Sequence, residues 1–288
     1  MLYLELLVQG LIQGSMYALI AVGLTLVYGL LRILHIAHAG LFTLGAYLAV
    51  VITNASGSLW LALLVAMPAV GLCGMVIYRL VYEPILHRPP YVALIASIGL
   101  FISMEEAFRL VFGPYGDSFT NPPFGHSVRI AGMMIKDVEI ATVAAALGLL
   151  AGLQVLATRT RIGIAWRATV TDPEMASSFG IDIVKVRYLN FFIGSSLAAL
   201  AGTLVALLSN LVEPTMGSVP SYKALAIIVL GGLGNVRGTL VASLALGVLE
   251  SYGVIYVGHL LDRDAIAFLF LIVVLMLRPQ GLMGGSRT

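Results

Sequence analysis

Residues 6–31 read LLVQGLIQGSMYALIAVGLTLVYGLL, a run of 26 residues without a charged side chain. A hydrocarbon core about 30 Å thick is crossed by about 20 apolar helical residues, so this run alone can span a membrane. Glu5 stands directly before it, and it is not preceded by the basic segment that begins a cleavable signal peptide. We therefore expect this run to stay as the first membrane helix.

The composition of the whole chain agrees with this interpretation. Apolar residues make up 60% of the chain and charged residues 10%, and the mean hydropathy is +1.01. A soluble domain carries roughly 25% charged residues, so this chain would aggregate in water. Its 288 residues leave room for roughly eight to ten spans and for no soluble domain beside them. We predict a single all-α, polytopic transmembrane domain over residues 1–288. The one cysteine, Cys73, excludes an intrachain disulfide framework.

Nine apolar runs predict eight or nine membrane-spanning or re-entrant helices. They cover residues 6–31, 39–53, 58–78, 91–104, 140–157, 188–212, 224–234, 238–261 and 265–277. The run at 224–234 is too short to span alone and ends in glycines, each of which weakens a helix by about 1 kcal/mol. It is either a short crossing or a re-entrant segment.

Two hydrophilic stretches separate these runs. Residues 113–139 hold several prolines and glycines and then an alternating pattern around Gly132, which predicts an external loop with a small hairpin. Residues 158–187 hold five basic residues against three acidic ones, so the positive-inside rule predicts a cytoplasmic loop. The five basic residues are Arg159, Arg161, Arg167, Lys185 and Arg187.

Nine alternating crossings extend this assignment to the whole chain. Eleven of the 16 Lys and Arg residues, Arg287 among them, then lie on the cytoplasmic side. The expected external residues are Arg109, Arg129, Lys136, Lys223 and Arg263. The asymmetry predicts an external N-terminus and a cytoplasmic C-terminus. A re-entrant 224–234 segment would break the parity.

The cytoplasmic loop is predicted to contain a short helix. In Thr171-Asp172-Pro173-Glu174, Thr171 can cap the helix while Glu174 reaches back, and Pro173 is tolerated in a first turn. Gly180 follows where a left-handed cap favours glycine. The alternative is a basic connector with an ordinary capping box.

The sequence of this loop also resembles a known element. Gly163-Ile164-Ala165-Trp166-Arg167-Ala168, followed by Asp172, Ala176 and Gly180-Ile181, is similar to the "EAA" coupling loop of ABC importer permeases. Over nearly the whole chain, the order and spacing of further strings resemble the LivH-type permeases of branched-chain amino acid ABC transporters. These strings are Tyr17-Ala18-Leu19, Gly23-Leu24-Thr25-Leu26, Tyr28-Gly29, Ala37-His38, Leu44-Gly45-Ala46-Tyr47, Leu230-Gly231-Gly232-Leu233-Gly234, Gly238 and Arg278-Pro279-Gln280-Gly281-Leu282.

The resemblance implies a permease subunit in the bacterial cytoplasmic membrane, forming the pathway for amino acids or related small amides or acids. It implies a second related permease, two cytoplasmic ATPases and an external solute-binding protein as partners, in contact with membrane lipid. ATP hydrolysis would belong to the ATPases, and the absence of a Gly-x-x-x-x-Gly-Lys-Ser/Thr string agrees. No cofactor and no nucleic acid are expected. The implied ATPase-coupling residues are Gly163, Ala165, Arg167, Ala168, Asp172, Ala176, Gly180 and Ile181.

One stretch departs from the pattern of the family. Where the family usually has Asn and then Phe-Ala-His-Gly and an acidic residue, this chain has His35, Ile36-Ala37-His38, Ala39 and Gly40. The substrate class therefore stays open between branched-chain amino acids and related acids or amides such as urea. His35 and His38 are expected to share a helical face near a membrane boundary. No third ligand lies nearby, so we predict hydrogen-bonded histidines and no metal site.

Other polar or glycine-rich positions are candidates for the substrate pathway. Gly231, Gly232 and Gly234, like the stretch from Gly23 to Gly29, could interrupt a helix and free backbone groups for a substrate, together with His35 and His38. Close helix packing is the alternative. Glu105 and Glu106 are each spaced to pair with Arg109, which favours a structural ion pair at the external boundary.

Two other classes of protein share parts of this pattern. An ion-coupled secondary transporter or a channel for a small polar solute would have the same composition and broken helices, but it needs no loop that docks onto an ATPase. An intramembrane serine protease would need a facing Ser and His, and Gly-x-Ser-x-Gly does not occur.

Overall fold

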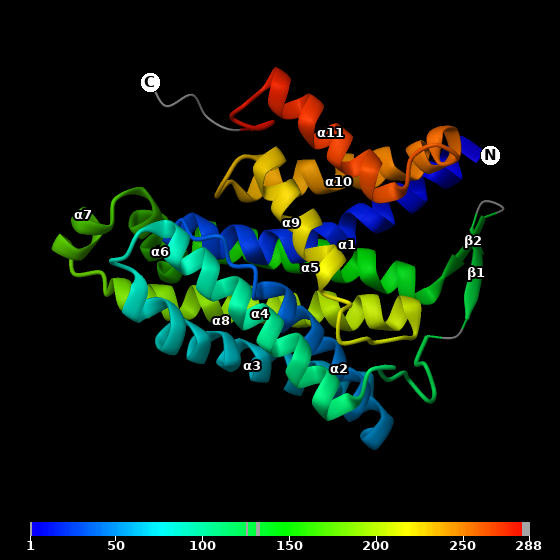
Figure 1. Ribbon diagram of the computed structural model, residues 1–288, viewed down its shortest axis with the longest axis horizontal. Coiled ribbons are helices and arrows are strands. Elements are labelled where there is room, and N and C mark those ends of the chain that lie inside the picture. The colour runs from blue at the N-terminus through cyan, green and yellow to red at the C-terminus, as the bar shows by residue number, and fades with distance from the viewer. Residues whose placement is uncertain (1, 125, 131–132, 284–288) are drawn as a thin grey trace.

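The computed structural model describes residues 2–124, 126–130 and 133–283, and its elements are almost all helices (Figure 1). In chain order the elements are α1 (Leu2–Leu31), α2 (His38–Ser56), α3 (Leu59–Ile77), the π-helical turn η1 (Tyr78–Tyr82), the 3-10 turn η2 (Glu83–Ile85), α4 (Pro90–Phe112), β1 (Ser127–Ile130), β2 (Met133–Lys136), α5 (Asp137–Arg159), α6 (Arg161–Thr171), α7 (Pro173–Ser178), α8 (Ile183–Ser209), α9 (Ser218–Gly231), α10 (Val236–Val257) and α11 (Arg263–Leu277).

The membrane architecture predicted from the apolar runs is confirmed. Seven helices in the described part of the chain are long and apolar enough to cross a membrane, namely α1, α2, α3 with its continuation to Ile85, α4, α5, α8 and α10. The 14 residues of α9 and the 15 of α11 cover the two remaining apolar runs. The protein is therefore a multi-pass, all-α membrane protein.

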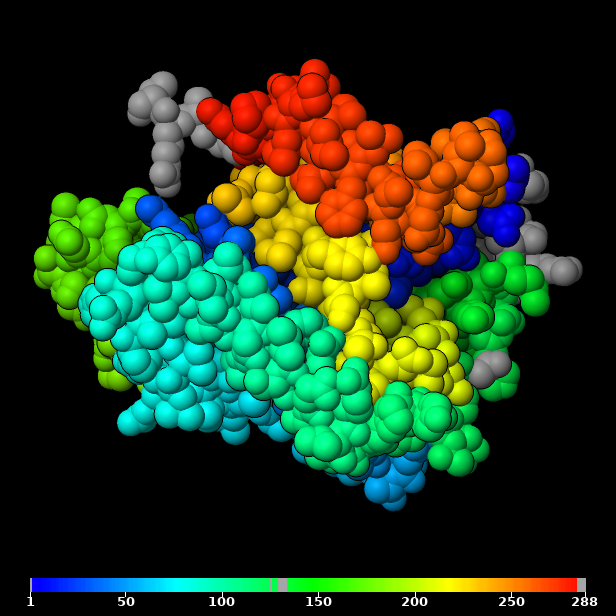
Figure 2. Space-filling view, viewed as in Figure 1, coloured from blue at the N-terminus to red at the C-terminus, as the bar shows by residue number. Residues whose placement is uncertain are grey.

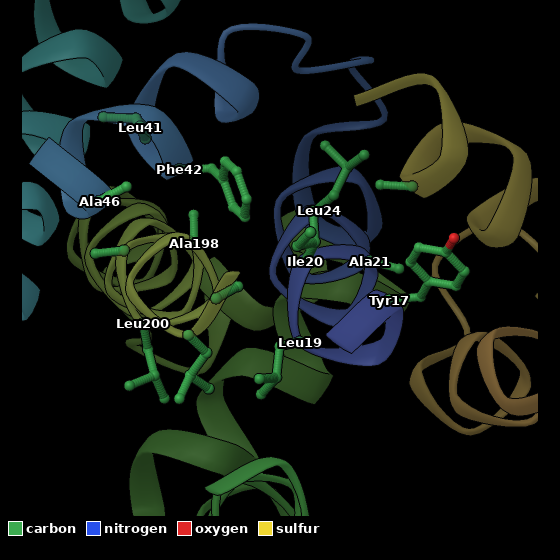
Figure 3. Close-up of a cluster of buried hydrophobic side chains, with 14 of the residues drawn as sticks. Tyr17, Leu19, Ile20, Ala21, Leu24, Leu41, Phe42, Ala46, Ala198 and Leu200 are labelled. Carbon is green, nitrogen blue, oxygen red and sulfur yellow. The ribbon is translucent and has the colours of Figure 1, made fainter. Parts of the chain in front are cut away.

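Three helices, α1, α2 and α8, form the centre of the bundle. Figure 3 shows Ile20 and Leu24 of α1 facing Phe42 of α2 and Ala198 of α8, and all four side chains are buried. Apolar burial provides little driving force between helices in lipid, so close packing has to hold such helices together. Glycine makes that packing possible: a Cβ at Gly14 of α1 would lie 2.8 Å from the Cα of Leu244 in α10.

The outer helices cover this centre only in part. On the face in Figure 2, α4 (cyan to green) and α11 (red) lie at the surface, and α9 (yellow) is visible between them. In α5, only 11% of the residues in its most apolar window are buried, against 78% in α8. The outer faces of α4 and α5 thus remain open to lipid or to another protein.

The bundle has two distinct ends, which we call the α7 end and the hairpin end. Figure 1 shows α6 and α7 at one end and the β1–β2 hairpin at the other. The strands pair antiparallel with Val128 opposite Ile135, so the predicted hairpin is confirmed; Gly132 itself lies outside the described residues. Asn54 of α2 holds the preceding loop, because its side chain donates to Ser118 O at 2.9 Å and accepts from Thr120 N at 3.0 Å.

In the N-terminal half, one alternative that the sequence left open is excluded and one prediction is wrong. The helix α1 is continuous through Gly23 and Gly29, so this stretch is not an interrupted helix, and Gly23 instead provides room for the ring of His38. His35 and His38 do not share a helical face. The chain leaves the helix at Arg32, whose φ of 55° is left-handed, and α2 begins only at His38.

The stretch 158–187 is more helical than the sequence suggested. Besides the short helix α7, it contains α6, an 11-residue helix whose N-cap Thr160 accepts a hydrogen bond from Gly163 N at 3.1 Å. The helix was missed because its basic residues and Gly163 suggested a connector. The stretch is therefore a helix–turn–helix.

Candidate functional site

The turn between α6 and α7 is capped one residue later than predicted. Asp172, not Thr171, is the N-cap of α7, since its Oδ1 accepts from Met175 N at 2.9 Å. The Thr171 hydroxyl instead donates to Arg167 O inside α6, at 2.9 Å. A carboxylate is as good an N-cap as a hydroxyl and adds a favourable charge at the positive end of the helix. Pro173 follows in the first turn, as predicted.

The end of α7 has the predicted left-handed glycine. Gly180 has φ +82°, and the next amide, Ile181 N, donates back to Ala176 O at 3.1 Å. Backward bonds of this kind satisfy the last carbonyls of a helix and turn the chain sharply. The chain then enters α8 at Asp182. The backbone N–H of Lys185, at 3.1 Å, and its ammonium group hold the pKa of the Asp182 carboxyl below its ordinary value.

The surface of this helix–turn–helix has an unusual composition for a segment outside the apolar spans. Met175 is 56% exposed and Phe179 is 80% exposed, whereas Ala176 between them is buried. A groove of about 550 Å³ runs beside them and is lined by Arg167, Ala168, Asp172 and Ile181 among others. Exposed large apolar side chains beside a groove are typical of a protein–protein contact.

The remaining predicted coupling residues lie on α6 and differ in burial. Gly163 is buried, and a Cβ there would overlap the carbonyl oxygens of Leu156 and Ala157, so it sets how closely α6 packs on α5. Ala165 is half-buried. Arg167 is exposed, and among the described residues no carboxylate lies within 4.0 Å of it.

The glycine-rich stretch between α9 and α10 forms a tightly packed loop. A Cβ at Gly231 would overlap the backbone of Gly238 and Thr239, while Gly232 (φ +99°) and Gly234 (φ +82°) have left-handed backbones. Gly234 lies beside Gly29, close to the α7 end of α1, and not in the middle of the bundle. Gly231 is therefore needed for close packing. Gly232 and Gly234 are needed because their left-handed backbones favour glycine.

A segment from the end of the described chain completes this loop. Leu282 N donates to Leu230 O at 2.6 Å, and Asn235 Nδ2 donates to Met283 O at 2.9 Å. Gly232 and Gly234 also line a cavity of about 530 Å³ together with Arg32. Hydrogen bonds to Leu282 and Met283 thus hold the loop, and the loop forms part of the wall of a polar cavity.

The two predicted pathway histidines lie apart from this loop. Both are buried, with ring centroids 5.7 Å apart, and His35 Nδ1 lies 2.6 Å from the hydroxyl of Tyr82 in the π-helical turn. His35 is thus hydrogen-bonded, as predicted, but neither ring nitrogen of His38 has a hydrogen-bond partner in the described part of the chain, so the prediction is wrong for His38. The structure places these residues at the break between α1 and α2 and does not bring them to the glycine loop.

A buried ionic cluster was missed by the sequence analysis. Lys223 of α9, predicted to be external, is 3% exposed, and its ammonium lies 3.0 Å from Glu250 Oε1 and 2.9 Å from Asp264 Oδ1. Tyr17 bridges the cluster, donating to Glu250 Oε2 at 2.7 Å and accepting from Lys223 at 2.9 Å. The hydroxyl of Tyr17 turns toward the C-terminal helices in Figure 3.

The cluster joins four helices, α1, α9, α10 and α11. Charges at membrane depth are expensive and are retained when they pair with one another. The signal that could have revealed it was Glu250, which lies inside the apolar run at 238–261. On α4, Arg109 pairs with Glu106 at 2.6 Å as predicted, but Glu105 accepts from Ser218 Oγ of α9 instead.

Comparison with known proteins agrees with this architecture. Residues 6–277 match the family model described as the branched-chain amino acid transport system / permease component. The chain is 32% identical to the high-affinity branched-chain amino acid transport system permease protein BraD of Pseudomonas aeruginosa, with 98% of this chain and 96% of BraD covered. It is equally similar to the corresponding permease LivH of Escherichia coli K12, at 32% identity and the same coverage. It is 25% identical to the permease LivM of the same bacterium, over 94% of this chain and 68% of LivM. The chain therefore belongs to the family of permease components of branched-chain amino acid transport systems.

Proposed function

We propose that this protein is the membrane-spanning permease subunit of an ABC importer that takes up branched-chain amino acids. The observation that carries the proposal is the helix–turn–helix α6–α7 at one end of the bundle. It exposes Met175 and Phe179 beside a groove of about 550 Å³, outside the apolar spans. An ion-coupled carrier would have no use for such a contact, whereas a permease driven from outside the membrane needs one.

The partners of the proposed importer follow from its mechanism. Two ATPase subunits hydrolyse ATP and bind at α7, a second related permease completes the pathway, and a solute-binding protein delivers the substrate at the hairpin end. The similarity to both LivH and LivM supports the pairing of two related permeases. The ordered hairpin β1–β2 and the anchored loop before it provide a firm surface for the binding protein.

The orientation in the membrane follows from charge. We propose that 158–187 faces the cytoplasm and that 113–139 is external, in the cytoplasmic membrane of a bacterium. Ten of the described basic residues lie in or next to the segments at the α7 end of the bundle, which is the asymmetry that the positive-inside rule associates with the cytoplasm. Arg287, also assigned to this side, lies outside the described residues.

The pathway itself is proposed to pass the break between α1 and α2 and the glycine loop. His35 and His38 carry buried ring nitrogens, of which His35 Nε2 and both of His38 have no hydrogen-bond partner in the described part of the chain. Such groups are costly unless something satisfies them. Gly232 and Gly234 line the polar cavity near Arg32. Replacing His38 by Phe should raise the KM for uptake more than it lowers the amount of assembled complex.

Reconstitution tests the proposal directly. Proteoliposomes would hold this permease with its sibling permease and ATPases, and uptake of labelled leucine, isoleucine and valine would be followed with binding protein outside and ATP inside. Uptake that requires all four components and ATP is the expected result, and unlabelled urea or acetamide should not compete. Uptake by this chain alone under an ion gradient would instead identify a secondary transporter.

A further inference from the structure

A cavity of about 510 Å³ lies at the α7 end of the bundle, between α5, α6 and the start of α10. Its wall is formed by Leu150, Leu153 and Gln154 of α5, Trp166 and Arg167 of α6, and Arg237 of α10, among others. It adjoins the loop at Leu233 to Asn235, which also lines the cavity near Arg32. We infer that this cavity binds one anionic phospholipid, with the headgroup at Arg167 and Arg237 and an acyl chain along α5.

The charge of the cavity selects an anion. Neither guanidinium has a carboxylate within 4.0 Å among the residues that the structure describes, and no Asp or Glu contributes to the wall. Arg237 also lies in the first turn of the 22-residue helix α10, where backbone N–H groups add positive potential. Basic pockets between membrane helices on the cytoplasmic side are the usual sites of anionic headgroups.

The shape of the cavity selects a lipid over a soluble anion. From Thr158 to Leu150 the wall follows α5 for about 12 Å away from the end of the bundle, at the rise of 1.5 Å per residue in a helix. Leu150, Leu153 and Ala157 make this part apolar. On the cavity side of α5, Gln154 and Thr158 are exposed, so no other helix in the described part of the chain closes this wall. A phospholipid from the surrounding bilayer can therefore enter sideways.

Trp166 adds an independent indication. It lies between this cavity and a smaller apolar one, and its indole Nε1 is shielded from solvent without a hydrogen-bond acceptor in the described part of the chain. Tryptophan is favoured at the membrane interface because its ring is apolar while its N–H reaches a polar group. The ring of Trp166 thus forms part of the cavity wall at a position typical of the membrane interface.

Other occupants fit less well. A branched-chain amino acid carries an ammonium group as well as a carboxylate, and the wall offers no acidic side chain to receive it. An ATPase outside the membrane could reach Arg167 but not the apolar part of the wall along α5. A bound lipid would connect α6 to α10, so the position of the coupling element would depend on the lipid.

Photolabelling tests this site without any transport measurement. The full chain is placed in nanodiscs with a phosphatidylglycerol, or a matched phosphatidylcholine, that carries a diazirine in one acyl chain, and labelled peptides are mapped by mass spectrometry. Phosphatidylglycerol should label residues 150–158 far more than phosphatidylcholine does. Each basic residue near an anionic headgroup contributes about fivefold, so Arg167→Gln with Arg237→Gln should reduce this preference by about 30-fold.

A matched double variant controls for overall charge. Arg88→Gln with Arg159→Gln removes two exposed arginines from the same end that do not line the cavity, and it should keep the preference. In detergent without phosphatidylglycerol, the melting temperature of both double variants should equal that of the unchanged chain. Equal labelling by the two lipids, or a preference that survives Arg167→Gln with Arg237→Gln, would overturn the proposal. Loss of labelling on adding the ATPases, or in glycerol 3-phosphate, would also overturn it, in favour of an ATPase contact or a soluble anion.

Discussion

At the scale of single residues, Lys223 depends on partners that are distant in the sequence. The residue is 3% exposed, and its ammonium lies between Glu250 and Asp264, on two other helices. Such a group is tolerated only because the pairing offsets its desolvation, and the loss of one partner leaves the other as an uncompensated charge.

Replacing Lys223 by Met should therefore lower the free energy of unfolding by about 3 to 5 kcal/mol, because Glu250 stays fully buried without its closest cation. Thermal unfolding in detergent measures the loss. Adding Glu250→Gln to Lys223→Met should restore part of the stability, since the remaining amide is neutral. If the double variant is less stable than Lys223→Met alone, the cluster does not act as a unit.

Gly231 offers a second residue-scale test with an internal control. A Cβ at Gly231 would overlap the backbone of Gly238 and Thr239, whereas one at Gly148 would meet nothing within 4 Å. Gly231→Ala should cost about 1 to 3 kcal/mol by overpacking. Gly148→Ala should raise stability by about 0.5 to 1 kcal/mol, because alanine restricts the unfolded chain and favours the helix. Equal shifts in melting temperature would contradict the packing assigned to Gly231.

Single residues also show where the sequence sufficed and where it did not. Pro173 and Gly180 were placed correctly because their roles depend on backbone geometry over a few residues. The choice between Thr171 and Asp172 as N-cap could not be made, since both side chains can cap and only the end of α6 decides. The buried pairing of Lys223 was missed because its partners lie 27 and more residues away, beyond any local pattern.

At the scale of elements, the proposed role of α7 as an ATPase contact depends on its exposed side chains. Phe179 is 80% exposed, so Phe179→Asp should leave folding within about 0.5 kcal/mol of the unchanged protein. If Phe179 anchors an ATPase, its loss should weaken that binding by about tenfold or more, as for a central interface residue. Co-purified ATPase measures this. Tyr115→Asp, which alters an equally exposed aromatic residue near the hairpin end, should have no effect.

Ala176→Trp and Gly180→Val address the shape of the same element. The first overfills a buried position at a cost of typically 1 to 3 kcal/mol, and the second strains a left-handed backbone by about 1 to 2 kcal/mol. Neither residue lies in a span, so the membrane level should stay normal while uptake falls. If both variants assemble and transport at the unchanged rate, α7 is only a connector.

The hairpin β1–β2 is predicted to receive the binding protein. Deleting residues 132–136 should lower uptake and leave the ATPases bound, because the deletion lies at the other end of the bundle. Met134→Glu is a milder change at a side chain that is 62% exposed, and it should reduce uptake in the same direction. Undiminished transport that still depends on the binding protein would count against this role.

A helix or strand could be predicted where its own residues form a recognisable pattern. The long apolar runs and the alternating hairpin were correct, since each is a repeated pattern. The break between α1 and α2 also agrees with the ends of the apolar runs. The conformation of the break, which separates His35 from α2, was not predictable because it is held by tertiary contacts such as the hydrogen bond from Ala37 N to Ser97 Oγ, at 3.0 Å.

At the scale of the whole molecule, the orientation rests on the uneven distribution of basic residues. Single cysteines at Ser118 and Ser178, both exposed, would be introduced into a Cys73→Ser background. An impermeant thiol reagent on whole cells should label the cysteine at 118 and not the one at 178. The reverse result would invert the topology, and labelling of both would indicate broken cells, which a cytosolic marker enzyme reveals.

The closure of the glycine loop by the segment at Leu282 also has a consequence for biosynthesis. The helices α9 and α10 leave the ribosome before this segment does, so the bond from Leu282 N to Leu230 O can form only after they have been inserted. The end of α9 therefore remains unlocked until the segment at Leu282 has been synthesised. A premature stop codon after Leu277 would yield a chain that keeps the described apolar helices but lacks the hydrogen bond from Leu282 to the end of α9.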